Sequence, residues 1–188
     1  MDCVNDYLMV TNLIPKQLCK SLIIESAHLN WEIHSWYDYT KDNVNAVPEK
    51  NPHAVLSTAN QFQNITKYLV ESLGEYQKKY STPGDKTGGK WINKITPIKF
   101  VRYDVGTYMH QHYDHIQSIF DGKLKGIPII SIVGLLNDNF EGGEFMCRGK
   151  EIKLAQGDIL LFPSNFMFPH EVKEITKGIR YSFVSWAF

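Results

Sequence analysis

The chain has 188 residues, of which 43% are hydrophobic and 13% aromatic. This is enough to bury a core in one domain, and it excludes an intrinsically disordered chain. Twenty basic and twenty acidic residues cancel, so the net charge gives no sign of a nucleic-acid partner or of a membrane surface. We therefore expect a peptide or a small molecule as the partner.

The cysteines and the N-terminus indicate a cellular compartment. Cys3, Cys19 and Cys147 are odd in number and widely spaced, which is typical of free thiols in a reducing compartment. The N-terminus is acidic where a secretory signal would be basic, and no apolar run approaches the roughly 18 residues of a membrane span. We expect an intracellular, soluble, cytoplasmic protein without a membrane partner.

The first half of the chain predicts two helices. Residues 15–27 place their leucines on one face, with Pro15 suited to the first turn. Residues 31–52 follow neither the helical nor the strand period and predict irregular structure. Residues 58–80 carry apolar residues at gaps of three and four, which predicts an amphipathic helix. Its stripe consists of Phe62, Ile65, Leu69, Leu73, Tyr76 and Tyr80.

The second half predicts short strands, after a loop at residues 81–90. The predicted strands cover residues 91–104, 108–114, 128–137, 143–148, 151–155, 158–163 and 179–188. Strands that follow helices favour a mainly β fold with supporting helices (α+β), namely a sandwich or barrel-like core with helices on one side. We expect one domain over residues 1–188, with helical support in about 1–90 and the β core in about 91–188.

The segment YMHQHYDH, residues 108–115, is a candidate metal site. In a strand, His110, His112 and Asp114 lie on one face and His115 lies on the other. Residues two apart on one face are about 6.6 Å apart and can share an ion, whereas residues four apart are about 13 Å apart. The spacing therefore favours the pair His112 and Asp114, and we expect His110 to line or support the pocket.

A third ligand would come from elsewhere, and His170 is the histidine of the C-terminal strands. Two histidines and one carboxylate form the facial triad that favours non-haem Fe(II) and leaves coordination positions open. The alternative is that the His-x-Asp pair arises by chance and that His170 is a turn residue. His28, His34 and His53 are predicted to be surface residues.

A candidate anion anchor follows His170. Arg180 lies ten residues later in an apolar strand, with Ser182 on the same strand face. A buried arginine can hold a carboxylate through two parallel charge-assisted hydrogen bonds, and a hydroxyl can add a third. The alternative is that Arg180 is a surface charge on its strand.

In their order and spacing, these motifs resemble the Fe(II) and 2-oxoglutarate-dependent oxygenases, and in particular the prolyl 4-hydroxylase-like branch, over about residues 95–188. The run from Tyr103 to Asp114 is similar to that branch's Y-x-x-G-x-x-(aromatic or Met)-x-x-H-x-D pattern, with Met109 at the variable position. The stretches LLNDNFEGGEF and GDILLFPS are similar to the family's acidic loop with a Gly-Gly-Glu turn and to its G-D-x-L-x-F strand. The segment from His170 to Trp186 is similar to the family's H-(nine residues)-R-x-S-x-x-x-W pattern.

The resemblance implies a double-stranded β-helix (jelly roll) with the N-terminal helices packed on one sheet. The implied Fe(II) ligands are His112, Asp114 and His170. The implied contacts of 2-oxoglutarate are Arg180 at the distal carboxylate, hydrogen bonds from Tyr103 and Ser182, and Trp186 nearby.

The resemblance also implies a reaction, in which O2 and 2-oxoglutarate yield succinate and CO2 while a substrate C–H bond is hydroxylated. A peptidyl proline or a related residue is the expected substrate, with ascorbate as a possible reductant. Prolyl hydroxylases of this branch usually carry an arginine where this chain has Pro128 or a neighbouring apolar residue. Residues 36–39 and 115–126 are candidate lids over the site.

Two alternatives to this expected function stay open. One is the same chemistry on a nucleobase or small metabolite, and the other is a non-enzymatic metal-binding jelly-roll or cupin module.

Overall fold

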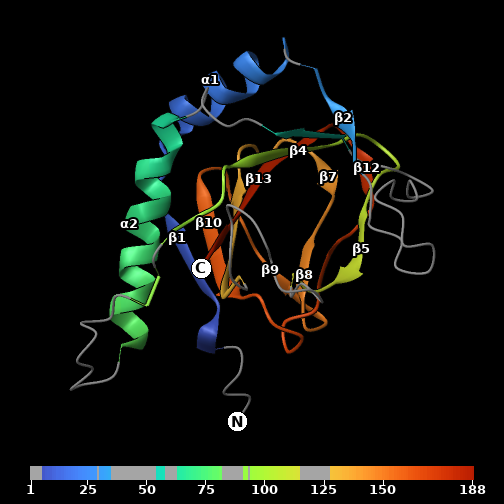
Figure 1. The fold of residues 1–188 in the computed structure, drawn as a ribbon. Coiled ribbons are helices and arrows are strands. Elements are labelled where there is room, and N and C mark those ends of the chain that lie inside the picture. Colours follow the sequence, from blue (N-terminus) through green and yellow to red (C-terminus); the bar gives the residue numbers. More distant parts are fainter. Residues whose placement is uncertain are drawn as a thin grey trace, which may run out of the picture.

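Antiparallel strands and two helices make up the described part of this computed structural model (Figure 1). It comprises residues 6–28, 30–34, 54–57, 63–81, 91–92, 94–114 and 128–188. The elements in chain order are β1 (Met9–Asn12), α1 (Lys16–Ser26), β2 (Glu32–Ile33), β3 (Ala54–Ser57), α2 (Gln63–Tyr80), β4 (Lys99–Tyr103), β5 (Met109–His112), β6 (Ile130–Leu135), β7 (Glu141–Gly142), β8 (Phe145–Cys147), β9 (Lys150–Ile152), β10 (Asp158–Pro163), β11 (His170–Val172), β12 (Ile175–Lys177) and β13 (Arg180–Ala187).

Both predicted helices are confirmed, although the predicted start of α2 at residues 58–62 lies outside the described residues. The predicted strand at residues 91–104 is shorter than expected and forms β4 only after Pro97. Strands β1, β2, β3, β7, β11 and β12 were not predicted. They have two to four residues each, which is too short for a period of two to stand out.

Two sheets face each other across an apolar core. The larger sheet has the strand order β1-β10-β6-β13-β4-β3-β2 and the smaller one has the order β5-β11-β8-β9, while β12 and β7 form a separate pair. Between the sheets, Val101, Val133 and Phe162 of the larger sheet share a buried cluster with Phe145 and Val172 of the smaller one. This arrangement confirms the predicted jelly roll with supporting helices.

The helices cover the outer face of the larger sheet (Figure 1). The stripe of α2 is buried through Ile65, Leu69 and Leu73, and it shares one cluster with Phe183 of β13 and Ile132 of β6. Because helices cover one face and the smaller sheet faces the other, every residue of β6 is buried. The inner face of the central strands is left to form a pocket.

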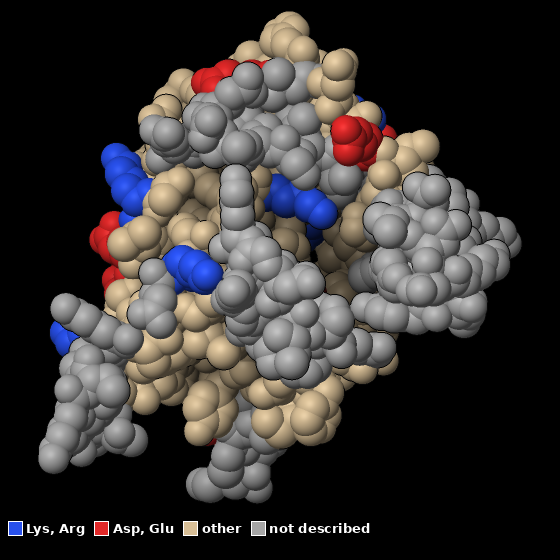
Figure 2. Space-filling model, in the orientation of Figure 1, with Lys and Arg blue, Asp and Glu red and all other residues tan. Residues whose placement is uncertain are grey.

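The surface carries charges of both signs, and the described cysteines are free thiols. Figure 2 shows acidic and basic side chains interspersed over the described part of one face. Cys19 and Cys147 are buried free thiols, whereas Cys3 lies outside the described residues. Neither of the described helices has the length and apolar character that a membrane crossing requires.

Candidate active site

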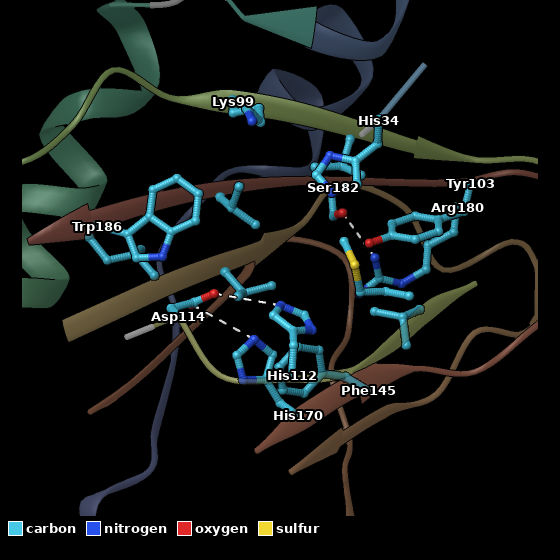
Figure 3. Close-up of a pocket in the computed structure, with 16 residues that line it drawn as sticks. His34, Lys99, Tyr103, His112, Asp114, Phe145, His170, Arg180, Ser182 and Trp186 are labelled. Carbon is cyan, nitrogen blue, oxygen red and sulfur yellow. Dashed lines mark hydrogen bonds and ion pairs between the residues drawn. The ribbon is translucent and has the colours of Figure 1, made fainter. Parts of the chain in front are cut away.

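Two histidines and an aspartate converge where strands β5 and β11 of the smaller sheet end and begin (Figure 3). His112 ends β5 opposite His170, the first residue of β11, and Asp114 follows β5. His112 Nε2 lies 3.5 Å from Asp114 Oδ1, and His170 Nε2 lies 3.7 Å from Asp114 Oδ2. One ligand atom from each residue lies within 4.8 Å of the other two, so the three can coordinate one ion.

Backbone carbonyls orient both imidazoles. His112 Nδ1 donates a hydrogen bond to the carbonyl oxygen of His110 at 2.7 Å, and His170 Nδ1 donates to that of Phe168 at 3.0 Å. Each ring therefore carries its proton on Nδ1, which leaves the Nε2 lone pair available to a metal ion. The ring of Phe145 stacks on His170 with centroids 5.6 Å apart, which restricts the rotation of that imidazole.

The electrostatics of the group suit metal ligation. Burial lowers the pKa of His170 more than the nearby Asp114 raises it, so this imidazole is neutral near pH 7. Burial alone would raise the pKa of Asp114, but its interactions with His112, His170 and Ser131 hold that pKa well below its usual range, so Asp114 is ionised near pH 7. The site thus offers the neutral imidazole of His170 and the carboxylate of Asp114 in the protonation states that a divalent metal binds.

A chain of buried hydroxyls positions the carboxylate. Ser131 Oγ donates a 2.6 Å hydrogen bond to Asp114 Oδ2 and lies 2.9 Å from Ser164 Oγ. Both serines are about 1% exposed. The sequence analysis did not identify them, although a polar residue within the apolar run PIISIVGLLN was a usable signal.

Replacing Ser131 with alanine is expected to weaken Fe(II) binding by about 10- to 100-fold, the usual cost of losing a residue that orients a metal ligand. Fe(II) or Mn(II) titration calorimetry under anaerobic conditions measures the effect. Ser185→Ala is the matched control, because Ser185 is equally buried in the same sheet but hydrogen-bonds Thr96 instead. Equal metal affinity of the two variants would contradict the assigned role.

The prediction for His34 is wrong, and the prediction for His110 holds only in part. His110 is exposed and outside the pocket lining, because the pairing of β5 with β11 shifts register between His112 and Met109 and breaks the alternation of faces. Its backbone oxygen nevertheless supports His112. His34 was predicted at the surface, but it is half-buried and lines the pocket. His28 is exposed as predicted.

Several predicted features cannot be placed. His53 and His115 lie outside the described residues. The same holds for both candidate lids and for most of the predicted loop at 81–90.

Arg180 provides the second feature of the pocket (Figure 3). It is 1% exposed, its Nη1 donates to Ser182 Oγ at 2.9 Å, and its guanidinium lies 5.2 Å from the ring centre of Tyr103. Its Nε is buried without a hydrogen-bond partner. Among the described residues no carboxylate pairs with this cation, although a buried charge requires a partner. A carboxylate ligand fits this environment.

The side chain of Asn137 holds the backbone on both sides of Arg180. Asn137 Nδ2 donates to the carbonyl of Ile179 and Asn137 Oδ1 accepts from the N–H of Tyr181, both at 2.7 Å. A Cβ atom on Gly143, which has φ +66°, would lie 3.1 Å from the Arg180 side chain and 2.3 Å from Ile175. Glycine is therefore needed there for the packing around the arginine as well as for the turn.

The central strands present the pocket residues in register. Arg180 lies opposite Tyr103, Ser182 opposite Val101, and Trp186 opposite Ser131. These alternate residues of β13 line a cavity of about 180 Å³ together with the metal-ligand group. The structure thus brings all seven predicted site residues to one pocket: Tyr103, His112, Asp114, His170, Arg180, Ser182 and Trp186.

Comparison with known sequences points to one family. Residues 98–188 match the model of the 2OG-Fe(II) oxygenase superfamily. A PKHD-type hydroxylase of Idiomarina loihiensis is 32% identical over 97 residues, which cover 50% of this chain and 42% of the relative. A PKHD-type hydroxylase of Acinetobacter baumannii is 33% identical over 101 residues, with 50% and 44% covered. The matches span less than half of these relatives.

Solved structures share the fold at low sequence identity. A viral collagen prolyl hydroxylase from Paramecium Bursaria Chlorella virus-1 has a TM-score of 0.67 at 16% identity and covers 100% of this chain and 98% of its own. A prolyl-4-hydroxylase of Pseudomonas putida has a TM-score of 0.63 at 17% identity, with 98% and 96% covered. The family model and these folds agree over the strands that carry the pocket: residues 98–188 belong to the 2OG-Fe(II) oxygenase superfamily, and the chain has a prolyl hydroxylase-like fold.

Proposed function

We propose that the protein is an Fe(II)- and 2-oxoglutarate-dependent dioxygenase that hydroxylates a substrate C–H bond and forms succinate and CO2. One observation carries the proposal: the His112, Asp114 and His170 group shares a pocket with a buried arginine whose Nε has no partner. A metal center alone would not require this cation. A metal-chelating 2-oxo acid with a distal carboxylate accounts for both features.

Each residue then has a defined task. His112, Asp114 and His170 hold Fe(II), which when bound supplies the chemistry of O2 activation. Arg180 receives the distal carboxylate of 2-oxoglutarate, and the hydroxyls of Ser182 and Tyr103 lie on the same side of the pocket to add hydrogen bonds (Figure 3). The apolar side chains of Val101, Val133 and other lining residues exclude water from the reacting atoms.

The proposed substrate is a peptidyl proline or a related residue. Support comes from the fold of the prolyl hydroxylases described above. A Trichoplax adhaerens prolyl hydroxylase, solved with a hypoxia inducible factor peptide fragment, has a TM-score of 0.67 at 17% identity and covers 99% of this chain and 85% of its own. By the resemblance described above, such enzymes usually carry an arginine that grips a peptide where this chain has Pro128 or a neighbouring apolar residue, so other residues must hold the substrate.

Anaerobic addition of Fe(II) and 2-oxoglutarate tests the chemistry. We expect a visible charge-transfer band from the chelate, followed on admission of O2 and ascorbate by succinate formation that proline-containing peptides stimulate. Asp114→Ala is the control and should give no band. A wild-type protein that binds Zn(II) but never gives the band would favor a non-enzymatic metal-binding module.

A further inference from the structure

We infer that Lys99 forms an anion-binding subsite at the substrate end of the pocket, and that the hydroxylated molecule carries a carboxylate close to the oxidised carbon. The inference rests on the proposed function, because it takes the Arg180 end of the pocket to be occupied by 2-oxoglutarate. It assigns a role to a cation that the proposed chemistry does not use.

Strand register separates the two cations of the pocket. Lys99 lies opposite Val184, whereas Tyr103 lies opposite Arg180. Lys99 and Tyr103 are both pocket-lining residues of β4 and are four positions apart, which is about 13 Å along a strand. Lys99 thus lies at the opposite end of the pocket from Arg180, on the same side as Trp186 (Figure 3).

The ammonium group of Lys99 has no counter-ion among the described residues. Burial lowers the pKa of Lys99, and the charge of Glu32 offsets this only in part, with no ion pair formed between them. Lys99 is half-buried, and a cation that is partly withdrawn from water is stabilised when an anion approaches it. A pocket cation in this state is a candidate binding group, and its missing partner is supplied when an anionic ligand enters.

His34 lines the same pocket and lies beside Ser182 (Figure 3). Burial and the charges of Lys99 and His112 lower the pKa of His34 to about 4, so the imidazole is neutral near pH 7. Lys99 therefore provides the positive charge here among the described residues. One ammonium group matches a singly charged carboxylate, whereas a phosphate dianion usually requires several donors.

2-Oxoglutarate leaves no carboxylate available to pair with Lys99. In the proposed function, the metal binds one carboxylate of 2-oxoglutarate and Arg180 binds the other, so a third anionic group must come from the substrate. For a proline substrate, this group is either its own C-terminal carboxylate or the side chain of an adjacent acidic residue.

Binding to the anaerobic Fe(II)–2-oxoglutarate protein tests the inference with two matched probe pairs. N-acetyl-L-proline is compared with N-acetyl-L-prolinamide, and N-acetyl-Pro-Glu-amide with N-acetyl-Pro-Gln-amide. Calorimetry and the shift of the charge-transfer band report binding without turnover. We expect at least one acid to bind about tenfold more tightly than its amide, as one hydrogen bond to a charged group provides. The pair that discriminates identifies the source of the carboxylate.

Variants of Lys99 complete the test. Lys99→Met should remove the preference for the acid and leave the affinity for 2-oxoglutarate within about twofold, whereas Lys99→Arg should retain the preference. Lys177→Met is the control, because that lysine is 74% exposed. A normal band with no acid bound more tightly than its amide overturns the inference alone. So does a tenfold loss of 2-oxoglutarate affinity in Lys99→Met. A wild-type protein without the band overturns the proposed function itself.

Discussion

Replacing His112 with alanine is expected to abolish turnover that depends on Fe(II) and 2-oxoglutarate. The loss should exceed the roughly 10- to 100-fold effect of removing a residue that only orients a ligand, because one of three protein ligands disappears. The Nε2 of His112 lies 3.5 Å from Asp114, within the ligand group. Succinate formation measures turnover, and calorimetry with Mn(II) under anaerobic conditions measures the metal affinity that should fall with it.

His110→Ala is the matched control within the same strand. Its side chain is exposed, and its link to the site is the backbone oxygen that accepts from His112 Nδ1. Since alanine keeps that oxygen, turnover should stay within about twofold of wild type, as for a typical surface substitution. An inactive His110→Ala protein with an active His112→Ala protein would show that the ligand assignment is wrong.

Replacing Arg180 with methionine is expected to raise the KM for 2-oxoglutarate by about 100-fold, because a hydrogen bond to a charged group contributes about 1.5–3 kcal/mol. Methionine fills much of the same space in the apolar surroundings, so the fold should persist. Metal affinity should not change, since Arg180 is absent from the ligand group. Steady-state kinetics with varied 2-oxoglutarate and calorimetry with Mn(II) separate the two effects.

Arg102→Met provides the control for Arg180→Met. Arg102 lies in the neighbouring strand opposite Tyr181 and forms a 3.0 Å ion pair with Asp104, with 31% of its side chain exposed. Exposed pairs of this kind contribute at most about 1 kcal/mol. Arg102→Met should therefore leave the KM for 2-oxoglutarate nearly unchanged. An equal rise in both variants would mean that Arg180 does not anchor the cosubstrate.

The sequence predicted the parts of the site that depend on strand parity or on long motifs. Arg180, Ser182 and Trp186 alternate along one strand, so their common face follows from a period of two. The alternation of strand faces wrongly placed the His110 side chain on the same face as His112, because the register shift in β5 depends on pairing with a strand more than fifty residues away. A bulge of this kind has no reliable local signal.

The residues that support the site were missed for a different reason. Ser131 and Asn137 act through partners far along the chain, at Asp114 and on either side of Arg180. Only the folded structure brings these pairs together. Lys99 was predictable in part, since parity from Tyr103 places it on the pocket face, but a single lysine in a strand is more often a solvent-exposed residue.

The metal-ligand histidines belong to one sheet, and the arginine belongs to the other. The separation of Fe(II) from Arg180 is therefore set by how far apart the sheets pack, about 10 Å for face-to-face sheets, and not by the reach of a single flexible side chain. In the proposed function, 2-oxoglutarate contacts both sheets, and the length of its carbon chain must match the distance between them. A 2-oxo diacid one carbon shorter could chelate the metal but would fall short of the guanidinium, so selectivity for cosubstrate length is a property of the core packing.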